Sequence, residues 1–134
     1  MRNVTLILLA AATAASCTTA PQPEPRSDRA AAELQRLLAG RVAGKPESCL
    51  PRHRSNNMVT IDANTIAFRE GRRVWVNNVR GSCHGLGWGG NALVTRDFGG
   101  RGLCSGDIAQ VVNTSSGMPV GSCVLGDFVP YSRP

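Results

Sequence analysis

The chain has 134 residues, with 15 basic and nine acidic side chains and a formal net charge of +6. This length is sufficient for one domain and too short for two. Lys45 is the only lysine, and the arginines are spread along the sequence. Such a distribution gives solubility and a mild attraction to anionic surfaces, but it does not indicate a nucleic-acid site.

The first 16 residues have the pattern of a secretory signal peptide. Arg2 gives a weakly cationic start, an uncharged run of apolar and small residues follows, and Ala14-Ala15-Ser16 precedes Cys17. The segment is too short to span a membrane. Its small-small-Cys ending resembles the cleavage site of bacterial lipoproteins, which implies that Cys17 is acylated and becomes the new N-terminus.

Anchoring through Cys17 would attach the protein to the cell envelope. Thr18 stands where an aspartate would signal retention at the inner membrane, so the resemblance points to a periplasm-facing lipoprotein of the outer membrane. Several acyl chains hold such a protein firmly, whereas a single chain binds only marginally. The alternative is cleavage after a set such as Ala12-Thr13-Ala14, which would release a soluble periplasmic or secreted protein.

A tether and a helix are predicted next along the chain. The segment 17–26 is polar and rich in proline, which is typical of a solvated tether. Within 27–40 we predict a helix from about Asp28 to Ala39, because Ser27 can cap its start and Gly40 suits its end. Its apolar face is predicted to pack on a sheet and to consist of Ala31, Leu34, Leu37 and Leu38.

Residues 45–131 are predicted to form a β domain. Short apolar segments separated by Gly, Asn and Asp are typical of strands, and six of them cover 58–62, 65–68, 73–79, 92–95, 103–112 and 120–129. They predict a mainly β (α+β) fold, either a small antiparallel sheet under one N-terminal helix or a barrel. The fragments 104–108 and 125–128 share a Gly-Asp-apolar step, which suits two similar bends.

Four cysteines remain when Cys17 is set aside, an even number that predicts disulfides in an oxidising compartment: Cys49, Cys83, Cys104 and Cys123. A hairpin over 108–124, centred near Ser116, would place Cys104 opposite a residue near Phe128. Cys104 would then lie about 16 Å from Cys123, too far for a bridge. Of the two other pairings we favour Cys49–Cys123 with Cys83–Cys104, each contributing about 3 to 4.5 kcal/mol.

The surroundings of these cysteines resemble those of a known family. The segments that carry the resemblance are Cys49-Leu50, Val59-Thr60-Ile61-Asp62, Val74-Trp75-Val76-Asn77, Cys83 with Gly85-Leu86, Leu103-Cys104-Ser105-Gly106-Asp107 and Cys123-Val124-Leu125. Together they are similar to an uncharacterised family of small exported bacterial proteins, a domain of unknown function, over about residues 47–131. The resemblance implies structural cysteines and supplies no catalytic residue.

The candidate binding region is a glycine-rich loop around Trp88. Glycines leave room for an aromatic side chain to present its face, and the candidate contacts are Trp88, Gly87, Gly89, Arg72, Arg73 and Arg80. We therefore expect a non-enzymatic envelope protein that binds a partner or a surface through its loops, with no cofactor and no metal. Residues 85–90 match the dinucleotide pattern G-x-G-x-x-G, but the residues after them read as a strand and not as the helix that this motif needs.

Two other functions remain open. The chain could inhibit a cell-wall-degrading enzyme, although its positive charge would repel a cationic lysozyme. It could instead handle metal or redox equivalents through Cys49, His53, Cys83 and His84, which would require free thiols or a thiolate–imidazole ligand set.

Overall fold

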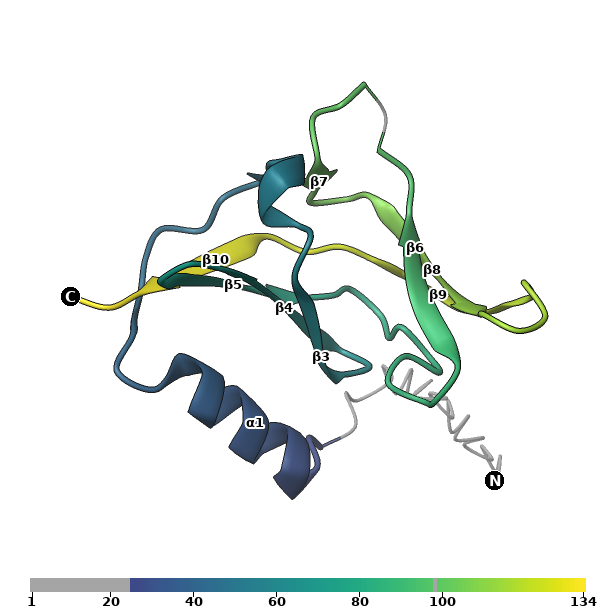
Figure 1. Ribbon diagram of the computed structural model, residues 1–134, viewed down its shortest axis with the longest axis horizontal. Coiled ribbons are helices and arrows are strands. Elements are labelled where there is room, and N and C mark those ends of the chain that lie inside the picture. The colour runs from purple at the N-terminus through teal and green to yellow at the C-terminus, as the bar shows by residue number, and fades with distance from the viewer. Residues whose placement is uncertain (1–24, 98) are drawn as a thin grey trace, which may run out of the picture.

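The computed structural model describes residues 25–97 and 99–134, so the predicted signal peptide, Cys17 and most of the tether lie outside the described residues. Within them the chain forms one α-helix, one short 3-10 helix and ten strands in three antiparallel sheets (Figure 1). The helices are α1 (Asp28–Leu38) and η1 (Arg52–Arg54). The strands are β1 (Val42–Ala43), β2 (Cys49–Leu50), β3 (Met58–Asp62), β4 (Thr65–Glu70), β5 (Arg73–Asn78), β6 (Asn91–Thr95), β7 (Leu103–Cys104), β8 (Ile108–Asn113), β9 (Pro119–Val124) and β10 (Phe128–Ser132). The predicted mainly β fold with one N-terminal helix is confirmed.

Helix α1 begins where the sequence predicts. The Ser27 side chain accepts a hydrogen bond from the backbone N–H of Ala30 at 3.3 Å, and Gly40 follows the helix with a φ of +68°. The predicted Ala31 is half-buried but is not part of the packed cluster. That cluster is formed by the buried Ala30, which was not predicted, and by the predicted Leu34, Leu37 and Leu38, which are half-buried. These positions follow the i, i+4, i+7, i+8 spacing of a helix face.

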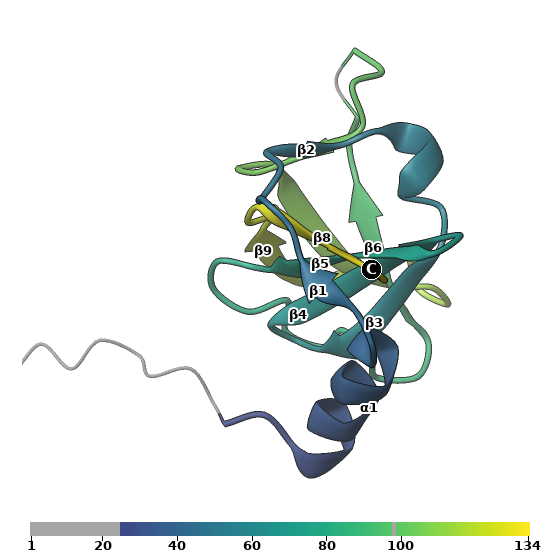
Figure 2. The ribbon, with the colours of Figure 1, turned by 90° about the vertical axis from the view of Figure 1, so that its left-hand side faces the viewer.

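Helix α1 covers one side of the largest sheet, whose strand order is β1-β10-β5-β4-β3 (Figures 1 and 2). Val74 and Val76 of β5 point to the helix side, where they pack with Ala67 and with the apolar face of α1. Trp75, the next residue in alternation, points to the other side and is fully buried. The five-stranded sheet is therefore buried on both faces.

The main core lies on the side of this sheet that faces away from α1. It contains Phe68, Trp75 and Phe128 from the large sheet and Ala109 and Val111 from β8. Strand β8 belongs to a second sheet of order β6-β8-β9, and the short β2–β7 pair closes one end of the molecule (Figure 1). The predicted hairpin register is confirmed, because Gln110 pairs with Ser122.

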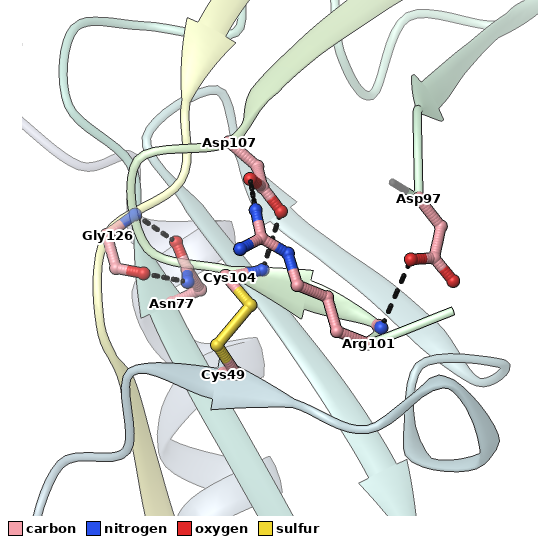
Figure 3. The surroundings of a disulfide bond; sticks show 8 residues. Cys49, Asn77, Asp97, Arg101, Cys104, Asp107 and Gly126 are labelled. Atoms are coloured by element: carbon pink, nitrogen blue, oxygen red, sulfur yellow. Dashed lines mark hydrogen bonds and ion pairs between the residues drawn. A yellow bond between two sulfur atoms is a disulfide. The ribbon is translucent and has the colours of Figure 1, made fainter. Parts of the chain in front are cut away.

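Two bends carry the chain from one sheet to the next. The segments predicted as single strands over 103–112 and 120–129 are each interrupted, at 105–107 and at 125–127, where the sequence shows its two Gly-Asp steps. The two bends contact each other, since the Gly106 N–H donates to the Leu125 carbonyl at 2.8 Å and the Leu125 N–H donates to the Asp107 carbonyl at 2.9 Å. The Asp107 carboxylate also accepts from the Cys104 N–H at 2.8 Å and pairs with Arg101 (Figure 3).

All four of these cysteines form disulfides, but the favoured pairing was wrong. The bonds are Cys49–Cys104 and Cys83–Cys123. Cys49 of β2 lies directly opposite Cys104 of β7, with 4.0 Å between their Cα atoms (Figure 3). The hairpin register correctly excluded a Cys104–Cys123 bond. The choice between the other two pairings was wrong because the pairing of β2 with β7 was not predicted.

Candidate binding site

The Trp88 loop, residues 83–91, connects the large sheet to β6. It consists of three successive turns, each closed by a backbone hydrogen bond. The Leu86 N–H donates to the Cys83 carbonyl at 2.9 Å, and the Trp88 N–H donates to the Gly85 carbonyl at 3.2 Å. The Asn91 N–H donates to the Trp88 carbonyl at 3.2 Å. At its start, Cys83 is bonded to Cys123 of β9, and the end of the loop is the first residue of β6. The loop is therefore held covalently at one end and by a sheet at the other.

Side-chain contacts fix the rest of this loop. Leu86 points into the core and is 5% exposed, and the Asn91 side-chain amide donates to the Gly85 carbonyl at 2.9 Å. A Cβ atom on Gly121 of β9 would collide with the His84 carbonyl, so β9 and the loop approach each other closely. The loop therefore offers a partner a preformed surface, which limits the ordering cost of binding.

Trp88 itself points away from this support. Its side chain is 64% exposed, and its ring meets the His84 ring edge to face, with 5.3 Å between centroids. Trp75 is fully buried in the core, so the structure assigns different roles to the two tryptophans. Tryptophan is one of the residue types enriched among the side chains that contribute most of the binding energy of a protein interface.

Other exposed apolar side chains lie on the β6-β8-β9 sheet and its turn. The described residues expose seven large hydrophobic side chains, and five of them lie on the Trp88 loop, on the β6-β8-β9 sheet or on its β8–β9 turn: Trp88, Val94, Ile108, Met118 and Val120. Val94 and Ile108 also line a hollow of about 410 Å³ together with Arg96, Gly106, Asp107 and Gln110. We call Trp88 and Val120, whose side chain lies against Gly85 of the loop, the apolar surface. Val94 and Ile108 lie on the outward face of the sheet, toward the end of β6 and the start of β8.

The glycines that flank Trp88 differ from each other. Gly87 has a φ of +88°, a conformation that favours glycine, whereas Gly89 is not among the glycines with positive φ and has no atom near the position of a Cβ. A side chain at residue 89 would therefore fit and would lie next to Trp88.

The predicted arginines lie in two other places. Arg72 and Arg73 lie at the β4–β5 turn, at the opposite end of β5 from the Trp88 loop, and the Arg72 carbonyl accepts a hydrogen bond from Arg41. Arg80 pairs with Val124 through the backbone and extends toward Ser105 at the first bend. The structure thus does not bring Arg72 and Arg73 to Trp88.

The residues of the metal and redox alternative are also separated. Cys49 and Cys83 belong to different disulfides, His53 lies 3.9 Å from the Glu70 carboxylate, and His84 contacts Trp88. In the part of the chain that the structure describes, no three His, Cys, Asp or Glu side chains are close enough to hold a metal ion.

Comparison with known proteins assigns neither a family nor a function to the chain. No family model, no curated protein and no solved structure matches the chain. The resemblance to a family of exported proteins is therefore supported only to the extent that this is a small protein with two disulfides. The disulfides indicate an oxidising, extracytoplasmic location. Among residues 25–97 and 99–134, no helix is long and apolar enough to cross a membrane.

Proposed function

We propose that this chain is an exported envelope lipoprotein, anchored through Cys17, whose folded domain is a non-enzymatic module that binds a partner protein through the apolar surface around Trp88. The two disulfides favour a compartment outside the cytoplasm. The small-small-Cys ending of the signal segment favours acylation at Cys17, and Thr18 in place of an aspartate favours the outer membrane as destination. The protein would thus face the periplasm at the end of a short tether.

The observation that carries the proposal is that Trp88 is exposed on a loop whose backbone is held by the Cys83–Cys123 disulfide and by its contacts with β6 and β9. An indole that is 64% exposed gains by burial against a partner, at roughly 25 cal/mol per Å² of apolar area removed from water. Because the exposed Val120 lies against Gly85 of the same loop, the partner contact is expected to extend from Trp88 over Val120. Exposed apolar side chains that adjoin one another typically mark a protein-binding site.

The surroundings of the histidines favour binding over catalysis. A nucleophilic enzyme needs an activated nucleophile in hydrogen-bond reach of an oriented base. The cysteine next to His84 is bonded to Cys123, and the His84 ring packs on Trp88. His53 is exposed beside Glu70 at the far end of β4.

Photo-crosslinking in intact envelopes tests the proposal. A photoreactive amino acid placed at Gly89 is accommodated by the backbone and lies beside Trp88. We expect a discrete adduct with one envelope protein on irradiation. Adding Trp88→Ala should reduce its yield strongly, because truncation of an interface tryptophan typically costs 2 kcal/mol or more, about 30-fold in affinity.

The matched control carries the same photoreactive residue at Lys45, an exposed position after β1, and is expected to give no comparable adduct. Strand β1 is the edge of the large sheet opposite to β3, whereas Gly87 of the Trp88 loop lies against Thr60 of β3. The proposal is wrong if residue 89 gives no discrete adduct, or if the adduct persists undiminished after Trp88→Ala. The variant must keep its unfolding midpoint, which is expected because the Trp88 side chain lies outside the core.

A further inference from the structure

A hollow at the end of α1 collects arginines that are far apart in the sequence. It measures about 330 Å³ and lies between the last turns of α1, the edge strand β3, strand β4 and the C-terminal end of β10. Its lining consists of Glu33, Arg36, Leu37, Arg41, Val59, Arg69 and Arg133. Figure 1 shows the end of α1 and the C-terminal end of the chain on the same side of the molecule.

The register of the large sheet explains why Arg69 and Arg133 meet there. Val74 of β5 lies between Arg69 of β4 and Tyr131 of β10. Val74 and Tyr131 pack on the helix side of the sheet. Arg69 lies level with Val74, and Arg133 is two residues beyond Tyr131, so both alternate to that same side.

The charge in the hollow is unbalanced. Four guanidinium groups face one carboxylate, which gives the lining a formal charge of 4 − 1 = +3. Glu33 approaches only Arg36, at 3.9 Å, and among the described residues Arg69 and Arg133 take part in no ion pair. An anion bound among these groups would relieve their mutual repulsion.

Arg41 is held in position without a carboxylate. Its Nη1 donates to the Leu37 carbonyl at 2.8 Å, and its Nε lies 3.4 Å from the Arg72 carbonyl. The first contact caps the end of α1, and the second connects Arg41 to the β4–β5 turn. Nη2 makes no intramolecular hydrogen bond within the described chain. Leu37 and Val59 are half-buried beside it, which reduces the access of water to one side of the hollow.

We propose that this hollow binds a phosphate ester through Arg36, Arg41, Arg69 and Arg133. Arginine presents a planar fork of donors that matches the oxygens of a phosphate group in a bidentate manner. The volume lies near the lower limit of small-molecule sites, which run from roughly 300 to 1,000 Å³, so the ligand is the size of a headgroup. Glu33 can accept a hydrogen bond from a hydroxyl group, which favours a hydroxylated ester such as glycerol phosphate over bare phosphate.

Such a group could belong to an anionic phospholipid or to a soluble metabolite, and two titrations distinguish these sources. The full chain in uncharged detergent micelles is titrated with glycerol 3-phosphate, and separately with phosphatidylglycerol added to the micelles, while the arginine Nε–Hε signals are followed by NMR. We expect saturable shifts of the Arg69 and Arg133 signals. The double variant Arg69→Gln/Arg133→Gln should weaken binding about tenfold or more, the effect of losing charge-assisted hydrogen bonds.

The control Arg52→Gln/Arg96→Gln removes the same charge from two exposed positions outside the hollow and should leave binding within about twofold. Binding of either probe with loss only in the first variant supports the proposal. Binding of one probe alone identifies the source of the phosphate group. No saturable shift with either probe overturns it, as does equal weakening in both double variants, which would show attraction to net charge alone. Because this site is separate from the Trp88 loop, the result does not depend on the proposed partner binding.

Discussion

The second bend of the chain depends on Asn77, a fully buried polar side chain in β5. Its amide group donates to the Gly126 carbonyl at 2.7 Å, and its side-chain oxygen accepts from the Gly126 N–H at 3.0 Å (Figure 3). Gly126 lies between β9 and β10, where the backbone pairs with neither sheet. The Asn77 side chain therefore takes the place of a neighbouring strand.

Asn77→Ala would leave two buried backbone groups of Gly126 without partners. Each unpaired group costs about 1 to 3 kcal/mol, so we expect a loss of about 4 kcal/mol in the free energy of unfolding. That is a large part of the roughly 5 to 15 kcal/mol that stabilises a domain. Asn57→Ala, on an exposed asparagine before β3, should cost less than about 0.5 kcal/mol.

Urea unfolding followed by tryptophan fluorescence measures both variants, since Trp75 is buried in the core and reports its exposure. The midpoint should fall strongly for Asn77→Ala while the slope stays the same. A loss below about 1 kcal/mol would refute the reasoning, because it would mean that water or a small shift of the backbone satisfies Gly126 instead.

The same unfolding assay tests the contributions of a disulfide, a close backbone contact and a helix cap to the free energy of unfolding. Replacing Cys49 and Cys104 together by alanine should cost about 4 kcal/mol, the chain-entropy value for a separation of 55 residues, and a cost below 2 kcal/mol would contradict this bond. Gly102→Ala should cost more than about 3 kcal/mol, because its Cβ would meet the Leu50 carbonyl. The control Gly117→Ala, also at positive φ but in open space, should cost only about 1 to 2 kcal/mol. Equal losses in the two variants would refute the close contact at Gly102. Ser27→Ala should cost about 1 kcal/mol through loss of the helix cap, and an unchanged midpoint would show that the cap is dispensable.

The local elements could be predicted because their signals are local. Strand β3 was predicted with its observed bounds, and the hairpin of β8 and β9 with its register, since alternation and turn residues determine both. The two Gly-Asp steps also indicated the bends. The burial of Asn77 could have been suspected, because it shares a face of β5 with Trp75.

The disulfide pairing and the arginine hollow could not be predicted from the sequence, because both depend on contacts between distant segments. The disulfide pairing depends on β2 lying against β7, two strands of two residues each that carry no periodic signal. The arginine hollow depends on the order of strands in the large sheet, which brings Arg69 beside Arg133 although they are 64 positions apart. Arginines that are spread along the sequence therefore gather at one place on the surface.

The proposed function presupposes an exported, anchored domain with the two observed disulfides. Digestion of the membrane-extracted protein with trypsin and an Asp-specific protease, without reduction, separates Cys104 from Cys123 and tests this directly. Mass spectrometry should find peptide 42–52 joined to 102–106, peptide 81–96 joined to 107–126, and an acylated peptide that begins at Cys17. Free thiols at Cys49 or Cys83, a link between 42–52 and 107–126, or an unmodified Cys17 would contradict the account.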